Sequence, residues 1–280
     1  MEEGDDLADA YEKADPIEHS EDDDGYDHVS VDHEDGIATI TMERTGHNNL
    51  INDYMAEDLR KASKRCLEDD DVCCIVLRGT EDVFSTGLDL DGINGSGSDG
   101  MRYRVLSNRV HTAIGNFTSA LKPVLAGVNG PAIDGGFGLA LACDLLLVDE
   151  NATFQFSYPE VGLSGDCGLT YFLPRSVGRH KAREIAMLHE PIDADEALEL
   201  GLATEVVASD SFDERLGELA ERLASEPTKA LGETKSLFNN NYERLLPDHF
   251  EKEEKAAQHV IDTDDFERGI EASRSGEEPE

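Results

Sequence analysis

The sequence predicts an α/β fold followed by a helical region. Segments with strand and helix patterns alternate at short intervals up to about residue 210, which is typical of an α/β domain. Beyond this point three consecutive segments, 212–225, 228–240 and 246–262, have apolar residues at helical spacing. The 280 residues suffice for one large core with an appendage.

The earlier elements each show a simple pattern. GIATITM (36–42) alternates apolar and polar residues and predicts a strand, and VCCIVLR (72–78) is a short β-branched run that predicts a buried one. Between them, 52–67 has helical spacing, with acids early and Lys and Arg later, as the helix dipole favours. The other predicted elements are a helix over 102–118 and strands over 122–130 and 143–148.

Both ends of the chain are charged and poor in apolar residues. This composition predicts disorder, because too little apolar surface is available to offset the ordering entropy. The chain is therefore expected to comprise a disordered acidic extension (1–30), an α/β core (31–210), a helical region (211–270) and a disordered tail (271–280).

The net charge is strongly negative. Asp and Glu number 62 against 24 Lys and Arg, which gives a formal charge of −38. This balance argues against non-specific nucleic-acid binding, which needs clustered cations. It favours a protein from a salt-accumulating cytoplasm, where high salt screens self-repulsion. The alternative is an ordinary acidic protein.

The chain has no apolar run of the ~18 residues that a membrane span needs, and its N-terminus (MEEGDDLADA) is acidic, with no secretory leader. A cytoplasmic location away from membranes is expected.

The chain has five cysteines, an odd number, and most of them lie in apolar runs, which predicts free thiols. The nine histidines lack metal-site spacing, so no metal is expected.

Two glycine-containing segments carry the candidate chemistry. FSTGLDL (84–90) and NGPAIDGGFG (129–138) each follow an apolar strand, and Gly135 falls where a helix should start. Unpaired N–H groups at such turns attract anions. If neighbouring strands bring the two turns together, two N–H groups could bind one oxygen as an oxyanion hole.

In this order, and followed by ACDLLLVDENATFQF and GLSGDCGLTYFLPRSVG, the two segments resemble the crotonase superfamily, the enoyl-CoA hydratase/isomerase family. The resemblance covers 31 to about 270 and includes RTGHNNLIN and DADEALELGLATEVV. It implies a ClpP/crotonase-like spiral of β–β–α units with a C-terminal helical trimerisation region. It also implies an acyl-CoA substrate, no separate cofactor, and a homo-oligomer, a trimer or hexamer.

The resemblance also implies roles for individual residues. Two peptide N–H groups hold a thioester enolate in this family, and by position they belong to Thr86 and Gly135. Residues expected to line the substrate site are Gly87, Asp89, Leu90, Asp134, Gly136 and Tyr158. The family's basic C-terminal tail is acidic here, so phosphate contacts are left to Arg102, Arg104, Lys122 or Lys235, among which the sequence does not choose.

The chain departs from the family's hydratases at both catalytic glutamates. One glutamate position is Gly138, and a gap-free alignment of the FGxPE segment puts Tyr158 at the other. Asp166 matches the aspartate of isomerase-like members with the pattern IPDxGG, which makes it the leading base, although an aspartate there could instead cap a helix. Glu160 could be a displaced carboxylate or a surface acid. Asp134 could act directly, but is expected to point away or cap a turn.

Three hypotheses follow. The first is an enzyme that isomerises a double bond, or transfers a related proton, through an enolate held by Thr86 and Gly135, with Asp166 as base. The second is an enoyl-CoA hydratase that uses displaced carboxylates such as Glu160. The third is a family member that binds acyl-CoA without catalysis.

Overall fold

The computed structural model describes residues 25–275 and contains two sheets. Nine strands are assigned within these residues: β1 (Val29–Glu34), β2 (Ile37–Met42), β3 (Cys74–Gly79), β4 (Val124–Val128), β5 (Ala132–Ile133), β6 (Leu145–Asp149), β7 (Thr153–Gln155), β8 (Ile192–Asp193) and β9 (Glu205–Val207). The larger sheet has the order β1-β2-β3-β4-β6-β9, and the smaller one has the order β5-β7-β8. In the larger sheet β1 and β2 are antiparallel, and all other pairs are parallel.

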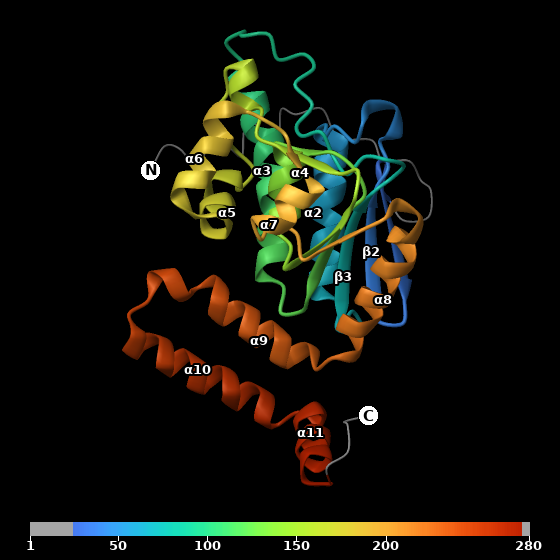
Figure 1. Ribbon diagram of the computed structural model, residues 1–280, viewed down its shortest axis with the longest axis vertical. Coiled ribbons are helices and arrows are strands. Elements are labelled where there is room, and N and C mark those ends of the chain that lie inside the picture. Colours follow the sequence, from blue (N-terminus) through green and yellow to red (C-terminus); the bar gives the residue numbers. More distant parts are fainter. Residues whose placement is uncertain (1–24, 276–280) are drawn as a thin grey trace.

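Helices cover both faces of the larger sheet (Figure 1). The helices are α2 (Asp53–Glu68), α3 (Asp99–Ser119), α4 (Gly135–Leu141), α5 (Leu169–Ser176), α6 (Gly178–Leu188), α7 (Ala194–Glu199), α8 (Phe212–Ser225), α9 (Thr228–Asn239), α10 (Leu246–Ile261) and α11 (Asp264–Ser275). The short 3-10 helices are η1 (Thr45–His47), η2 (Tyr158–Val161), η3 (Ser209–Ser211) and η4 (Asn241–Glu243).

The two faces of β3 show how the layers form. Ile75 and Leu77 belong to the main core with α2 and α3, while Cys74 and Val76 pack against α8. Each of these four side chains is at most 2 % exposed. Strands buried on both faces are continuously apolar, which explains the run that predicted this strand.

Most predicted elements are confirmed within one to three residues, and α8 matches its predicted bounds. The boundary expected at residue 211 between the α/β core and the helical region, however, is wrong, because the next helix packs against the sheet. Phe212, Leu216 and Leu219 of α8 are buried against the sheet, so α8 is part of the core. The helices that lie apart from the sheet are α9, α10 and α11 (Figure 1). This arrangement and the sheet topology agree with the α/β fold and helical C-terminal region expected from the resemblance.

The disorder expected at both ends falls largely outside the described residues. Where it can be compared, it is wrong at two places. Val29 and Ser30 begin β1, whose hydrogen bonds to β2 order them, and α11 continues to Ser275.

No helix within 25–275 combines the length and apolar character needed to cross a membrane. All five cysteines are free thiols, as predicted.

Candidate active site

The turn at 84–88 is held between two other segments of the chain. On one side Ile51 donates its N–H to the Gly87 carbonyl (2.8 Å) and accepts one from Asp89 (2.9 Å). On the other side Ser85 accepts the Ile133 N–H at 2.9 Å and donates its own to Pro131 at 3.1 Å. The turn therefore lies directly beside the segment that leads into α4.

Gly87 and Gly135 are in close contact, as the two-turn hypothesis required. A Cβ built on Gly87 would lie 3.4 Å from the Gly135 nitrogen, and one built on Gly135 would lie 3.5 Å from the Gly87 Cα. Gly87 has φ +96°, a backbone conformation that residues other than glycine rarely adopt. Gly136 packs as closely, because a Cβ there would lie 2.2 Å from the Ser85 carbonyl oxygen. The sequence correctly brought these two segments together.

The prediction that the Thr86 N–H faces the substrate is wrong in this structure. That N–H donates to the Asn48 carbonyl at 3.2 Å, and the Thr86 hydroxyl donates to the same oxygen at 3.0 Å. The next candidate is Leu88. Because its two neighbours bond to Ile51, the Leu88 N–H points to the opposite side, toward the segment that leads to Gly135. Within residues 25–275 neither the Leu88 nor the Gly135 N–H has a backbone partner.

Asp134 points away from the two amides and fixes a neighbouring turn. One carboxylate oxygen accepts the N–H groups of Ser157 (2.6 Å) and Tyr158 (3.0 Å), and the other accepts the Ser157 hydroxyl at 2.7 Å. Burial raises the pKa of Asp134, and these hydrogen bonds counter the rise only in part. Its φ of +48° is unusual for a residue with a side chain, so three hydrogen bonds hold it in a strained conformation.

Asp166 accepts four hydrogen bonds at the turn before α5. The hydroxyls of Tyr103 and Ser107 both lie 2.7 Å from Oδ2, while His111 Nε2 lies 2.6 Å and the Cys167 N–H 2.7 Å from Oδ1. Burial alone would raise the pKa of Asp166, but hydrogen bonds from His111, Tyr103 and Ser107 outweigh it and hold that pKa well below its usual range. Asp166 is therefore a stable anion at neutral pH.

The partners of Asp166 respond to its charge. The hydrogen bond with Asp166 raises the pKa of His111, although partial burial opposes the rise. Burial and the same carboxylate raise the pKa of Tyr103 far above its usual value, so it stays a neutral donor. Tyr103, Ser107 and His111 are four residues apart on α3 and share one face of that helix. Sequence reasoning missed all three, although polar residues at this spacing were a usable signal.

The Asp166–Cys167 turn packs directly against α4. The Cys167 sulfur would lie 3.3 Å from a Cβ on Gly135, and the Cys167 carbonyl oxygen would lie 2.1 Å from one on Gly138. Burial raises the pKa of the Cys167 thiol to about 12, so it is a protonated, inert group. The residue that follows Asp166 is thereby in contact with Gly135. No side chain fits at Gly138 without a backbone shift.

The proline of η2 corrects the alignment that put Tyr158 at a hydratase glutamate position. Residues 156–160 read FSYPE, and Pro159 lies in the first turn of η2, so the FGxPE pattern places its glutamate at Glu160. Glu160 is exposed and lies 3.5 Å from the Gln155 side-chain amide. The Tyr158 hydroxyl is buried and has no hydrogen-bond partner within 25–275.

The remaining predicted substrate residues have structural partners. Asp89 forms an ion pair with Arg44 at 2.7 Å, and Leu90 packs against the main core. Burial would raise the pKa of Asp89, but the Asp91 N–H and Arg44 lower it overall. Asp89 therefore shapes the turn rather than reaching into the site.

Two of the four basic candidates for phosphate binding are used inside the protein. Lys122 donates to the carbonyls of Cys66 and Asp69, and Lys235 donates to the Phe117 carbonyl at 2.7 Å. Both lysines are buried. Arg102 donates to the Gly92 carbonyl at 3.0 Å and is exposed, as is Arg104, so these two remain accessible to a ligand.

Within the described residues, His111, Asp166 and Cys167 form the cluster that could hold a metal, with ligand atoms within 4.8 Å of one another. The hydrogen bonds of Asp166 and the protonated thiol account for this cluster as a hydrogen-bond network, so we assign it no metal.

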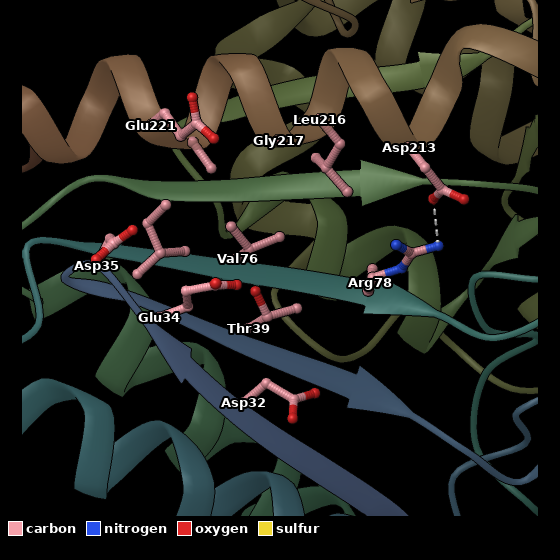
Figure 2. A pocket seen from close by; sticks show the side chains of 12 residues that line it. Asp32, Glu34, Asp35, Thr39, Val76, Arg78, Asp213, Leu216, Gly217 and Glu221 are labelled. Carbon is pink, nitrogen blue, oxygen red and sulfur yellow. Dashed lines mark ion pairs between the residues drawn. The ribbon is translucent and has the colours of Figure 1, made fainter.

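A separate hollow of 310 Å³ lies between α8 and the sheet (Figure 2). Arg78 pairs there with Asp213 at 2.8 Å. The hollow faces away from α3 and takes no part in the site.

Comparison with known proteins agrees with this geometry. The sequence model of the family described as enoyl-CoA hydratase/isomerase matches residues 32–275. The chain belongs to this family. It is 35 % identical to 4-chlorobenzoyl coenzyme A dehalogenase-1 of Arthrobacter sp., over 84 % of each chain. It is 30 % identical to 1,2-epoxyphenylacetyl-CoA isomerase of Escherichia coli K12, over 88 % of this chain and 95 % of the other.

Among solved structures, an enoyl-CoA hydratase from Bacillus anthracis has a TM-score of 0.84 and 27 % identity, over 91 % of this chain and 98 % of the other. Proteins of this enoyl-CoA hydratase/isomerase family with a crotonase fold therefore include hydratases, isomerases and dehalogenases. Membership of this family indicates an enzyme that acts on an acyl-CoA. The type of reaction must be inferred from the site.

Proposed function

We propose that this protein binds an acyl-CoA thioester with its carbonyl oxygen between the N–H groups of Leu88 and Gly135. The contact between the 84–88 turn and the start of α4 supports this proposal, because it puts the Gly135 nitrogen beside Gly87, the residue that precedes Leu88. An enolate oxygen held this way is strongly stabilised, since losing one such donor costs about 3–4 kcal/mol. Leu88 replaces Thr86 as the first donor.

The proposed chemistry is proton transfer at the Asp166 network, most simply the isomerisation of a double bond. Removing a proton breaks a C–H bond beside the double bond and leaves its electron pair in a dienolate. Returning that proton to another carbon completes the reaction, so no water is consumed. Asp166 supports this proposal because the turn that carries it packs against Gly135.

A two-glutamate hydratase mechanism is disfavoured by Gly138. The Cys167 carbonyl occupies the space beside its Cα, so the first glutamate is missing for a steric reason. Glu160 remains as a single exposed carboxylate. Hydration would therefore need a water held by other groups, and we rank it below isomerisation.

Dehalogenation is the second candidate function, and the ionised state of Asp166 favours it. A carboxylate oxygen can attack a ring carbon that bears chlorine when the oxyanion hole draws electrons toward the thioester carbonyl. Chloride then leaves, and water cleaves the resulting aryl ester to give a phenol and regenerate the carboxylate. The 35 % identical dehalogenase supports testing this reaction with 4-chlorobenzoyl-CoA.

The test is a set of parallel assays in about 2–3 M KCl, a level chosen to screen the acidic surface. A 3-enoyl-CoA, crotonyl-CoA and 4-chlorobenzoyl-CoA are supplied separately, and product mass and released chloride are measured. We expect isomerisation without a gain in mass, reduced in Asp166→Asn and retained in the matched variant Glu160→Gln.

The other outcomes each select a different function. A product heavier by one water and lost in Glu160→Gln would make the protein a hydratase. Chloride release that depends on Asp166 would select dehalogenation. A folded protein that binds CoA thioesters without turning over any of them would contradict this proposal and support a non-catalytic role.

A further inference from the structure

The four hydrogen bonds of Asp166 make it a poor base. An incoming proton would have to displace one of the donors that hold each oxygen, and the loss of negative charge would weaken all four bonds. Of these donors, the hydroxyls of Tyr103 and Ser107 and the Cys167 N–H cannot take up a proton at neutral pH. The imidazole of His111 can.

We infer that His111, oriented by Asp166, is the base that takes up and returns the substrate proton. This inference rests on the proposed function and names the group that performs its proton transfer. The two ring nitrogens of His111 have different surroundings. Nε2 lies 2.6 Å from Asp166 Oδ1, while Nδ1 has no hydrogen-bond partner within residues 25–275.

An ionised Asp166 fixes the tautomer of His111. A carboxylate that cannot donate requires the proton on Nε2, so the lone pair of the neutral ring is on Nδ1. The His111 side chain is 46 % exposed, so a bound molecule can reach the ring. Asp166 then plays the part that an orienting carboxylate plays beside a histidine base in other enzymes: it holds the ring and stabilises the imidazolium.

The proton transfer step balances without another reactant. The Nδ1 lone pair takes the proton as the substrate C–H bond breaks, and the electron pair moves into the dienolate held by Leu88 and Gly135. The imidazolium then gives the proton to the second carbon, and its charge is balanced throughout by Asp166. The carboxylate itself is never protonated.

The groups around His111 allow a pH dependence of the rate to be assigned to this residue. Asp166 faces it from the turn before α5 and Ser107 faces it from its own helix, while Tyr103 and Cys167 donate to the same carboxylate. Asp166 is the charged member of this set, and Tyr103 and Cys167 stay neutral well above pH 7. A pH dependence between 6 and 9 therefore reports on His111.

The test is the pH profile of kcat/KM for 3-enoyl-CoA isomerisation in about 2–3 M KCl. We expect the wild-type rate to fall about tenfold per pH unit below an apparent pKa that lies above the ordinary 6.5 of histidine. His111→Gln keeps a donor to Asp166 but cannot take up a proton, so its rate should fall at least 100-fold. The matched control is His180→Gln, an exposed histidine on α6, which should behave as wild type.

Asp166→Asn separates the two assignments. If His111 is the base, residual activity should remain and its acid limb should move down toward 6.5, because the imidazolium loses its partner. If Asp166 is the base, Asp166→Asn should abolish activity, His111→Gln should retain most of it, and no acid limb should appear between pH 6 and 9. That second pattern would overturn the inference.

A wild type that turns over no enoyl-CoA would defeat the proposed function without deciding the pairing. NMR titration of the histidines then decides it. The pKa of His111 should lie above the ordinary 6.5 of histidine and fall toward it in Asp166→Asn. A His111 pKa that is not raised in the folded protein and does not change in Asp166→Asn would overturn the inference regardless of activity.

Discussion

Gly138 allows two parts of the candidate site to pack against each other. Its Cα lies so close to the Cys167 carbonyl that the Asp166–Cys167 turn can rest directly on α4. The same contact excludes the glutamate of a hydratase. Catalytic specialisation and packing are therefore coupled at this position.

Gly138→Ala should destabilise the protein by about 3 kcal/mol and reduce turnover, because the added methyl group must push the Asp166 turn away from α4. The measurement is urea unfolding together with the isomerase assay. Gly115→Ala is the control. It lies on α3 with open space around its Cα, so this change should stabilise the protein by about 0.5–1 kcal/mol. Equal stability of Gly138→Ala and wild type would show that the turn is not held by this contact.

The Asp166–His111 pair should also make stability depend on pH. The folded-state pKa of His111 is raised, so its contribution is complete below the unfolded value near 6.5 and is lost as pH rises through the folded value. The difference in unfolding free energy between wild type and His111→Gln should therefore be larger at pH 6 than at pH 9.5. A difference that does not change with pH would mean that the ion pair does not form.

The sequence was informative about the site where a backbone motif carries the signal. It predicted that the two glycine segments meet, as the contact between Gly87 and Gly135 confirms, because tight turns restrict which residues are allowed. It failed at Thr86, since the direction of an N–H group depends on which neighbouring strand takes the adjacent hydrogen bonds. It also missed the contact between His111 and Asp166, because the partner of a side chain on an exposed helix face is set by tertiary packing.

At the scale of elements, α9 is attached to the core by buried polar contacts. Lys235 forms an ion pair with Asp144 at 2.8 Å and donates to the Phe117 carbonyl. Nearby, a Cβ on Gly232 would lie 2.1 Å from the Leu121 carbonyl oxygen, so the helix approaches the core backbone closely. These contacts set the direction in which α9 leaves the core.

Lys235→Met should destabilise the protein by about 2–3 kcal/mol, because it removes the ion pair to Asp144 and the donor to the buried carbonyls of Phe117 and Lys122. Lys229→Met, an exposed lysine on the same helix, should change stability by less than about 0.5 kcal/mol. Chemical unfolding of both variants gives the comparison. Similar losses in the two variants would show that removing a lysine, rather than the buried contact, is responsible.

The helical periodicity predicted α8, α9 and α10 well, but not what they pack against. An amphipathic pattern shows that a face is buried and does not identify its partner. Phe212 and Leu216 cover the sheet, whereas the helices after α8 leave it. The core therefore includes a helix that chain order alone had assigned to the appendage.

At the scale of the whole molecule, the charge of −38 should make stability depend on salt. Repulsion among surface carboxylates opposes the compact state, and at 1 M salt the screening length is only about 3 Å. The thermal midpoint should therefore rise steadily from dilute buffer to about 3 M KCl. A midpoint that stays constant would identify an ordinary acidic protein and contradict salt adaptation.

The helices α9–α11 present apolar side chains that a second copy of the chain could cover. Exposed apolar residues in this region include Phe238, Tyr242, Leu245, Leu246 and Phe250. Several exposed apolar side chains on neighbouring segments are typical of a protein interface. We predict a homo-oligomer with three or six chain masses in analytical ultracentrifugation at high salt. Replacing Leu245 and Leu246 together by Glu should shift the protein to a folded monomer, because charged groups would be buried without partners. Lys252→Glu on α10 should retain the oligomer. A wild type that sediments as a monomer at micromolar concentration would show that this surface has another use.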